Sequence, residues 1–483
     1  MTSLGSALHG AARDALVFTG SILLNRLGSL VLLPIYWSRL SPEDYGILAV
    51  IAVIGAFQAL LGTLSLDLAI TRFYYEWPET VRRRNLGAIW SWNWIAALGS
   101  GGLFLLAFPF LGPVIFRDVP YDPWLMLGII SNMLASLFIV PASTIRIKRL
   151  PWLFAAYSLG GFAVSTALGL WFVLVLDEGL RGLIVSTILS NLVLAVVGAV
   201  VMLRFSQPSL TSPGLRDAFR FALPATPSQL INVAGSVLDR FLLSQFTNLQ
   251  TLGVYSVSLK FVEVLTALHQ SLKMTYGPFM MKSISEDRRG GSELVVSVTP
   301  YYVIPYLAVA LGLSLFIGPL VRFIDQPEYL GVVEWVPWLA GIQVIGSLYF
   351  YYTNGLFLGN RTDLLSLPAI VRLVALAVTG VLLVAPLQLA GIVISRYLSE
   401  LIFLGLSLYL SQRIFHLAHR WNTLIGLCVV AVGFAVVGQL LTLDRAAWEL
   451  AAKVVLWVSF VGVGWLIVGD HRRPRAAGVV RSD

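Results

Sequence analysis

Residues 26–57 read RLGSLVLLPIYWSRLSPEDYGILAVIAVIGAF, two apolar runs separated by a short polar turn. Each run belongs to a longer apolar segment, 15–38 and 45–66, of the length that a helix needs to cross a bilayer. Lipid offers backbone N–H and C=O groups no partner, so an apolar run of this length has to be helical. The stretch therefore predicts two transmembrane helices joined by a turn of a few residues.

The composition extends this prediction to the whole chain. Of 483 residues, 57% are hydrophobic and 12% are charged, whereas about a quarter of the residues in a soluble domain are charged. The hydrophobic share amounts to about 275 residues, which at roughly 20 residues per crossing is enough for about 14 helices. A soluble enzyme, a disordered chain and a single-span receptor are excluded. We expect an all-α polytopic membrane protein.

Fourteen apolar segments are predicted to cross the membrane, and the loops between them are short. The segments are 15–38, 45–66, 87–110, 123–145, 152–176, 182–203, 218–245, 252–280, 295–319, 332–357, 364–386, 389–411, 422–442 and 447–468.

A weak internal repeat groups these segments. LSPEDYGILAV (residues 40–50) aligns without a gap with TNLQTLGVYSVS (residues 247–258) when Gly46 is set against Gly253. Transporters often consist of two repeats with the substrate site between them. The repeat predicts a six-helix lobe over 1–210, a second six-helix lobe over 211–415, and two additional helices with a basic cytoplasmic tail over 416–483.

Loop charges predict the orientation. Twenty-one Lys and Arg residues fall in the loops and tails on the side of the N-terminus, against five on the opposite side. Basic loops stay in the cytoplasm, so both termini are expected there. These loops account for most of the net charge of +8, and no nucleic-acid partner is expected.

The sequence lacks the usual signals of catalysis. No GK[ST] phosphate loop is present, and Cys428 is the single cysteine. His416 and His419 are three residues apart but have no neighbouring acidic or cysteine ligand. We therefore expect no enzyme activity, no metal site and no cofactor.

Seven cations fall inside predicted spans: Arg26, Arg240, Lys260, Lys273, Arg372, Arg396 and Lys453. Each costs about 3 kcal/mol at a helix centre, so such residues indicate function. Arg372, Lys273 and Lys453 lie near span ends, where long side chains can reach the membrane surface. Arg26 lies about midway along its segment and cannot easily do so.

Three acidic residues lie close to these cations in the sequence: Asp239 next to Arg240, Glu263 three residues after Lys260, and Glu400 four residues after Arg396. The last two spacings allow ion pairs on one helix face. Two interpretations stay open, namely structural ion pairs that fasten helices and a polar cavity between the lobes. In the second case the surplus of cations favours an anionic substrate, for example one that carries phosphate.

RLGSLVLLPIYWSRLSPEDYGILAVIAVIGAF (residues 26–57) and LSLDLAITRFYYE (residues 64–76) resemble the polysaccharide-transporter family, and GVYSVSLKF (residues 253–261) resembles it in the second half. This family contains the Wzx-type flippases of O-antigen and exopolysaccharide repeat units. It belongs to the superfamily of multidrug antiporters and oligosaccharidyl-lipid flippases. The resemblance implies 12 or 14 helices, with two six-helix bundles that form a V.

The resemblance also implies a function. Members move a polyprenyl-diphosphate-linked oligosaccharide from the inner to the outer leaflet of the bacterial cytoplasmic (inner) membrane by alternating access. By position, the candidates for diphosphate binding are Arg26, Arg240, Lys260, Lys273 and Arg396, and those for ion coupling are Asp239, Glu263 and Glu400. Segments 422–442 and 447–468 would form a groove for the lipid tail. The expected partners are the lipid-linked substrate, the bilayer, and polymerase and chain-length proteins of the pathway.

Three other functions are possible for a chain of this kind. A multidrug or cation antiporter of the same superfamily would need acidic residues to dominate the spans, which here are rich in cations. A membrane glycosyltransferase, polymerase or ligase would need a large external loop, and the external loops here are short. A structural scaffold would leave the intramembrane cations without a role. The polar residues Asn132, Asn191, Gln229 and Asn232 are candidates for substrate specificity.

Overall fold

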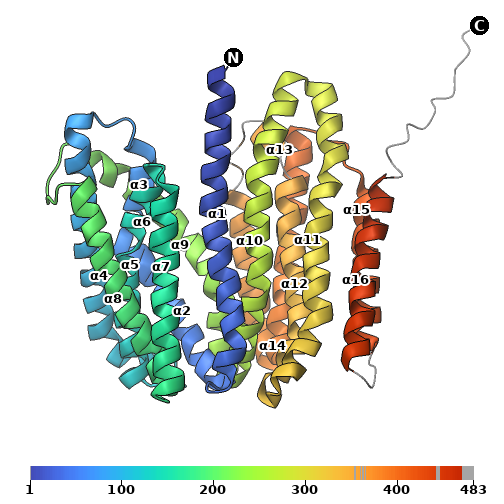
Figure 1. The fold of residues 1–483 in the computed structure, drawn as a ribbon, viewed down its shortest axis with the longest axis horizontal. Helices are drawn as coiled ribbons and strands as arrows, with labels where there is room; N and C mark the ends of the chain where they lie inside the picture. Colours follow the sequence, from blue (N-terminus) through green and yellow to red (C-terminus); the bar gives the residue numbers. More distant parts are fainter. Residues whose placement is uncertain are drawn as a thin grey trace, which may run out of the picture. The chain divides into compact units, whose positions relative to one another are not determined.

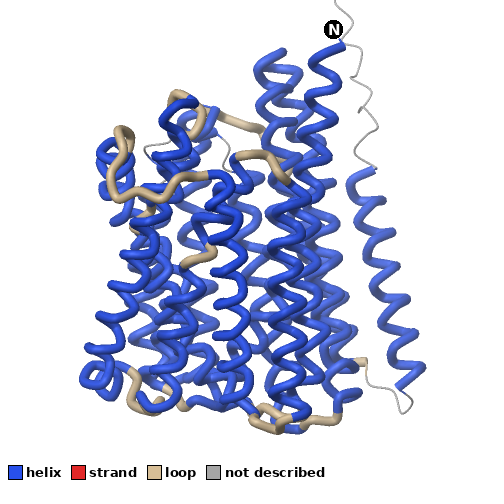
Figure 2. Tube along the Cα trace, turned by 60° about the vertical axis from the view of Figure 1, so that its left-hand side comes forward, coloured by secondary structure: helices blue, strands red, loops and turns tan. Residues whose placement is uncertain are grey.

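The computed structural model describes residues 2–352, 355–358, 361, 364, 366–441 and 446–469. Over these residues the regular structure is helical and contains no strand (Figure 2), which confirms the predicted all-α class. The basic C-terminal tail lies outside the described residues. Two compact units are present, residues 1–257 with 376–395 and residues 258–375 with 396–483, called here the first and second unit. The lobes expected over 1–210, 211–415 and 416–483 stay a prediction.

The first unit contains the following elements (Figure 1): α1 (Thr2–Trp37), α2 (Pro42–Thr63), α3 (Leu66–Phe73), α4 (Glu79–Ile115), the π-helical turn η1 (Tyr121–Leu125), α5 (Met126–Ser136), α6 (Ile139–Ile147), α7 (Pro151–Leu170), the π-helical turn η2 (Trp171–Val175), α8 (Gly179–Phe205), α9 (Leu215–Phe246) and the beginning of α10 (Leu249–Glu286).

The second unit contains the rest of α10, then α11 (Arg288–Ile324), the 3-10 turn η3 (Pro327–Tyr329), α12 (Leu330–Tyr352), α13 (Gly355–Leu358), most of α14 (Ser366–Ile414), α15 (Trp421–Leu440) and α16 (Ala446–Gly469). The middle of α14, residues 376–395, belongs to the first unit.

Twelve helices within the described ranges are long and apolar enough to cross a membrane. One of them, α14, has 49 residues and is broken at Gln388, where φ is 49° and ψ is −122°. Its two halves match the predicted segments 364–386 and 389–411. Helix α9 spans 32 residues but carries many polar side chains, and it is not among the twelve. The described residues thus contain twelve candidate spans against the fourteen segments expected, and the difference lies in α9 and in the two halves of α14.

Local sequence explains where α2 begins. Ser41 caps the helix, since its hydroxyl accepts a hydrogen bond from the Asp44 amide at 3.3 Å. The Asp44 carboxylate in turn accepts one from the Ser41 amide at 2.8 Å. This reciprocal capping box, followed by Pro42 at the first helical position, fixes the sharp turn after α1.

The two glycines aligned by the internal repeat pack against each other's segments in the first unit. A Cβ atom on Gly46 would lie 2.2 Å from the Leu249 carbonyl oxygen. A Cβ atom on Gly253 would lie 1.7 Å from the Pro42 carbonyl oxygen. Because real Cβ atoms cannot approach so closely, only glycine allows the start of α2 and the start of α10 to touch backbone to backbone. Repeat-related positions thus make a reciprocal contact.

Candidate functional site

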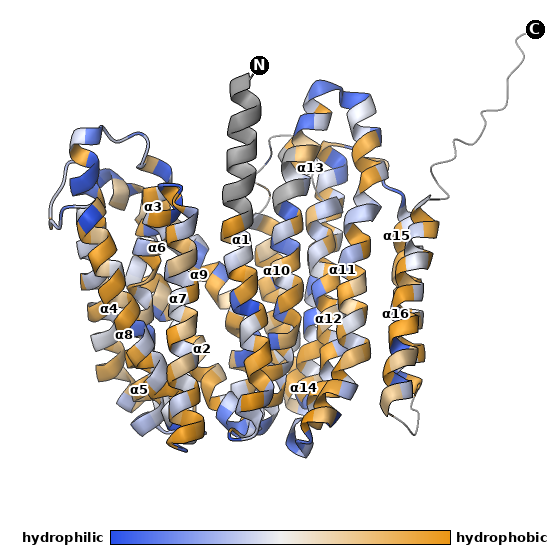
Figure 3. Ribbon diagram, in the orientation of Figure 1, coloured by the Kyte–Doolittle hydropathy of each residue, from blue (hydrophilic) through white to orange (hydrophobic). Residues whose placement is uncertain are grey.

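Helix α1 presents Arg26 on an exposed face of the first unit. Its neighbour Asn25 donates a hydrogen bond to the Ser158 hydroxyl of α7 at 2.7 Å. A Cβ atom on Gly28 would lie 2.6 Å from the Phe162 ring, so the same helix face packs closely on α7. These contacts fix the rotation of α1 and leave Arg26 on the opposite, exposed side. Figure 3 shows hydrophilic residues that interrupt the hydrophobic surface of α1.

The adjacent residues Asp239 and Arg240 point their side chains to different sides of helix α9. Asp239 is 4% exposed, and its carboxylate accepts hydrogen bonds from the Tyr255 hydroxyl at 2.5 Å and from the Arg240 backbone amide at 2.8 Å. Consecutive helical residues point about 100° apart. The Arg240 side chain is accordingly half-buried while Asp239 points into the unit.

Two of the four residues expected to determine specificity hold helices together. Asn132 donates to the Ile51 carbonyl at 3.0 Å, and Asn191 donates to the Ser131 carbonyl at 3.1 Å. By contrast, Asn232 donates to Gln229 at 3.2 Å on an exposed part of α9. Gln229 and Asn232 are therefore accessible to a ligand. Asn132 and Asn191 instead link helices of the first unit.

In the second unit, α10 carries a polar stripe. Glu263, Thr266, Gln270 and Lys273 follow one another at intervals of three or four residues, so they share one helix face. Thr266, Gln270 and Lys273 are exposed. Polar side chains within a span normally face a bundle interior or a water-filled cavity. Lys260 lies one turn before Glu263 on the same helix.

An aromatic cluster supports this stripe. The His269 ring lies 6.0 Å from Phe350 and 6.1 Å from Tyr351 of α12, measured between ring centroids. The Lys273 ammonium lies 4.9 Å from the centroid of Phe350. Gln343 of α12 donates a hydrogen bond to Thr266 at 3.0 Å. The α10–α12 face therefore combines a cation, hydrogen-bonding groups and aromatic rings.

Helix α14 places the Glu400 carboxylate beside Arg372. The Arg372 guanidinium donates to Glu400 at 3.1 Å and lies 4.9 Å from the centroid of Phe403. Glu400 thus pairs with Arg372 on the other half of α14. The expected partner was Arg396, which precedes Glu400 by four residues. Arg372, which was expected to reach the membrane surface, is engaged in an ion pair that fastens the two halves of the helix.

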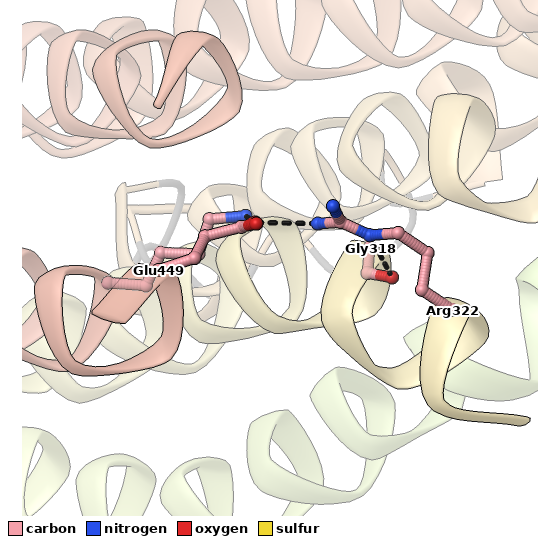
Figure 4. A network of polar contacts seen from close by, with 4 residues as sticks. Gly318, Arg322 and Glu449 are labelled. Carbon is pink, nitrogen blue, oxygen red and sulfur yellow. Dashed lines mark hydrogen bonds and ion pairs between the residues drawn. The ribbon is translucent and has the colours of Figure 1, made fainter. Parts of the chain in front are cut away.

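Glu449 of α16 is an intramembrane acid that sequence reasoning missed. One of its carboxylate oxygens lies 2.6 Å from the Lys453 ammonium and 2.6 Å from the Arg322 guanidinium of α11 (Figure 4). The Arg322 Nε–H donates to the Gly318 carbonyl at 3.3 Å. The side chains of Glu449 and Lys453 are 3% and 6% exposed. Lys453 is therefore buried and paired, contrary to the expectation that it reaches the surface.

The signal for this pair was available, because Glu449 precedes Lys453 by four residues, one helical turn. Two of the seven intramembrane cations, Arg372 and Lys453, thus have carboxylate partners that the sequence analysis did not expect. The five candidates for diphosphate binding lie on α1, α9, α10 and α14: they are Arg26, Arg240, Lys260, Lys273 and Arg396. Among the described residues, no three His, Cys, Asp or Glu side chains converge as metal ligands.

The fold defines a class: a multi-pass, all-α membrane protein. It is similar to the structure of "Lipid II flippase MurJ, inward closed conformation", with a TM-score of 0.70 and 10% identity over 96% of this chain and 99% of that one. An inward-facing multidrug resistance MATE family transporter of the MOP superfamily aligns with a TM-score of 0.56 and 16% identity, over 81% and 98% of the two chains. These likenesses establish the fold.

The family follows from the sequence. The profile of the family described as "Polysaccharide biosynthesis protein" matches residues 38–333, more than half of the chain. The chain belongs to this family, and the resemblance seen in residues 26–57 and 64–76 is confirmed. No curated protein matches the chain in sequence.

Proposed function

We propose that the protein is a flippase that moves a polyprenyl-diphosphate-linked oligosaccharide repeat unit from the inner to the outer leaflet of the bacterial cytoplasmic membrane, for surface polysaccharide such as O-antigen or exopolysaccharide. Transport is by alternating access, and the protein itself is not an enzyme. The observation that carries the proposal is the set of cationic, hydrogen-bonding faces on helices α1, α9 and α10. Such residues are retained inside a membrane when they bind a substrate or an ion.

The diphosphate would be bound by Arg26, Arg240, Lys260, Lys273 and Arg396, since guanidinium and ammonium groups form charge-assisted hydrogen bonds to phosphate oxygens. The oligosaccharide would be recognised by the exposed amides of α9 and by the α10–α12 face. Gln343 and Thr266 provide hydrogen bonds there, and Phe350 provides an aromatic ring. Polymerase and chain-length proteins would take up the product on the outer side.

The membrane potential favours outward movement. With the inside negative, one charge crossing about 100 mV is worth about 2.3 kcal/mol, and a diphosphate with two negative charges gains roughly twice that. Asp239, Glu263 and Glu400 are the residues through which a proton or sodium gradient would add to this force. Replacing all three by neutral residues should abolish any dependence of transport on that gradient.

A multidrug or cation antiporter is the second candidate. The buried carboxylate of Asp239 favours it, because antiporters of cations need acidic residues inside the membrane. The two candidates differ in the charge of their substrates and hence in the effect of removing a cation. Loss of Arg26 should impair the transport of an anionic lipid and leave that of a cation intact or improved.

The test is complementation of a strain that lacks this protein, with surface polysaccharide as the readout. Arg26→Ala should reduce the polysaccharide at least about tenfold at wild-type expression, since a charge-assisted contact is worth more than about 1.4 kcal/mol. Arg39→Ala is the matched control, because Arg39 forms an exposed ion pair with Asp177 at 2.6 Å. Full polysaccharide in Arg26→Ala cells would overturn the proposed function.

A further inference from the structure

A basic cavity of about 740 Å³ lies in the second unit, apart from the polar faces described above. It is formed between the start of α11 and the strap of residues 415–420, which joins α14 to α15. Its charged lining consists of Arg288, Arg289, Arg420, His416 and a single acid, Glu293. Figure 3 shows hydrophilic residues gathered at the turn between α10 and α11, where this cavity begins.

The strap is held by hydrogen bonds and ring contacts, and its side chains are alternately exposed and buried from His416 to Arg420. Leu417 is buried, and its backbone N–H and C=O both bond the Gln412 side chain at 3.1 Å. The buried His419 ring lies 4.8 Å from the Tyr352 centroid and 5.7 Å from that of Trp421. The residues in between, His416, Ala418 and Arg420, are exposed and line the cavity.

One arginine of the cavity is oriented by an aromatic ring, and none of the three forms a salt bridge among the described residues. The Arg288 guanidinium lies 5.0 Å from the centroid of Phe415, a cation–π contact that orients it. Asp287 is engaged with the Arg289 backbone amide at 3.0 Å as the cap of α11. Within the described ranges, Arg288, Arg289 and Arg420 form no salt bridge, whereas Arg72 and Lys282 pair with acids one turn away on their helices.

The same cavity has an apolar part. Val296 of α11, Ile414 of α14 and the Phe415 ring line it together with the arginines. Both α11 and α14 are candidate spans, and they end at this cavity. Its place is therefore the boundary between hydrocarbon and headgroups, where phosphate and an acyl chain lie side by side. Basic pockets between transmembrane helices at this depth suit anionic lipid headgroups.

We propose that this cavity binds an anionic phospholipid, with the phosphate held by Arg288, Arg289 and Arg420 and the upper acyl chain against Val296 and Phe415. The site is separate from that of the transported substrate and does not depend on the proposed function. Orientation of the protein by basic loops requires only charge. A role in orientation alone does not explain why His416 and Arg420 of the strap both face the same cavity. It also does not explain the contact between Phe415 and Arg288.

The test measures phosphatidylglycerol retained by the purified full chain in native mass spectrometry, after reconstitution in phosphatidylcholine with and without phosphatidylglycerol. Wild type should retain one phosphatidylglycerol more than the R288Q/R289Q/R420Q variant, with affinity at least about tenfold higher. The R82Q/R83Q/R84Q variant is the matched control. It removes three arginines that already donate to the carbonyls of Trp77, Arg204 and Thr211, so it should bind as wild type does.

Phe415→Ala keeps every charge and therefore the orientation of the chain, and it should weaken binding by a smaller factor than the triple variant. Equal retention by wild type and the triple variant would overturn the proposal, as would equal loss in the control. Displacement of the lipid by inorganic phosphate at equal concentration would show a site for a free anion and would overturn it as well.

Discussion

His419 shows how one buried residue makes the stability of the strap depend on pH. Burial lowers the pKa of His419 to about 4, against about 6.5 for an exposed histidine. The neutral ring is thus favoured in the fold. The stabilisation is complete above about pH 6.5 and is lost as the pH falls toward 4.

We expect the wild-type protein to lose about 2 kcal/mol through this residue between about pH 7.5 and about pH 5. His419→Phe fills the same space between Tyr352 and Trp421 and cannot be protonated. Its thermal unfolding midpoint should therefore fall less over this interval than that of wild type. Parallel pH dependences of the two proteins would contradict the assignment.

The Glu449–Lys453 pair gives a second prediction at this scale. Glu449→Leu would leave the buried Lys453 charge without its carboxylate, which costs about 3–5 kcal/mol. Glu449→Leu combined with Lys453→Met removes both buried charges, and the solvent still reaches the half-exposed Arg322. The double variant should therefore be more stable than the single one in thermal unfolding. Additive losses would show that the two side chains are not coupled.

At the same scale, sequence reasoning located cations better than their partners. Arg26 lies on an exposed face of α1, and its place in a diphosphate site stays a prediction. Glu449 stands one turn before Lys453, a spacing that itself indicates their ion pair. Partners on other segments, such as Arg372 for Glu400 and Arg322 for Glu449, depend on packing between elements that are distant in sequence.

At the scale of elements, apolar runs predicted the helices but not their irregularities. The break in α14 at Gln388 falls in the two-residue gap between the segments 364–386 and 389–411. The predicted span 123–145 is divided in the structure into η1, α5 and α6. Helix α3 was not predicted. Hydropathy records how many residues cross the membrane, whereas such breaks depend on local backbone geometry and on neighbouring helices.

The contact between α2 and α10 gives a prediction for elements. Gly46→Ala would place a methyl group 2.2 Å from the Leu249 carbonyl oxygen, so the backbones must separate at a cost of about 1–3 kcal/mol. Gly99→Ala in α4 is the control, because nothing lies within 4 Å of its Cβ position. There, the higher helix propensity of alanine should leave stability unchanged or raise it by up to about 1 kcal/mol. The thermal unfolding midpoints of the two variants test this prediction, and equal midpoints would contradict it.

At the scale of the whole molecule, the excess of basic residues in alternate loops predicts the orientation. A green fluorescent protein fused to the C-terminus should fluoresce, since it folds in the cytoplasm. Alkaline phosphatase inserted between Asp325 and Gln326, in the turn between α11 and α12, should be active, since that turn is expected outside. The opposite pair of results would invert the expected topology.

The reciprocal contact of Gly46 and Gly253 has a further consequence, for permeability. Where two backbones touch without intervening side chains, the space between them is too narrow for a water molecule. In this conformation no water molecule fits between the two backbones where they touch, so the contact point itself offers no path for water or ions.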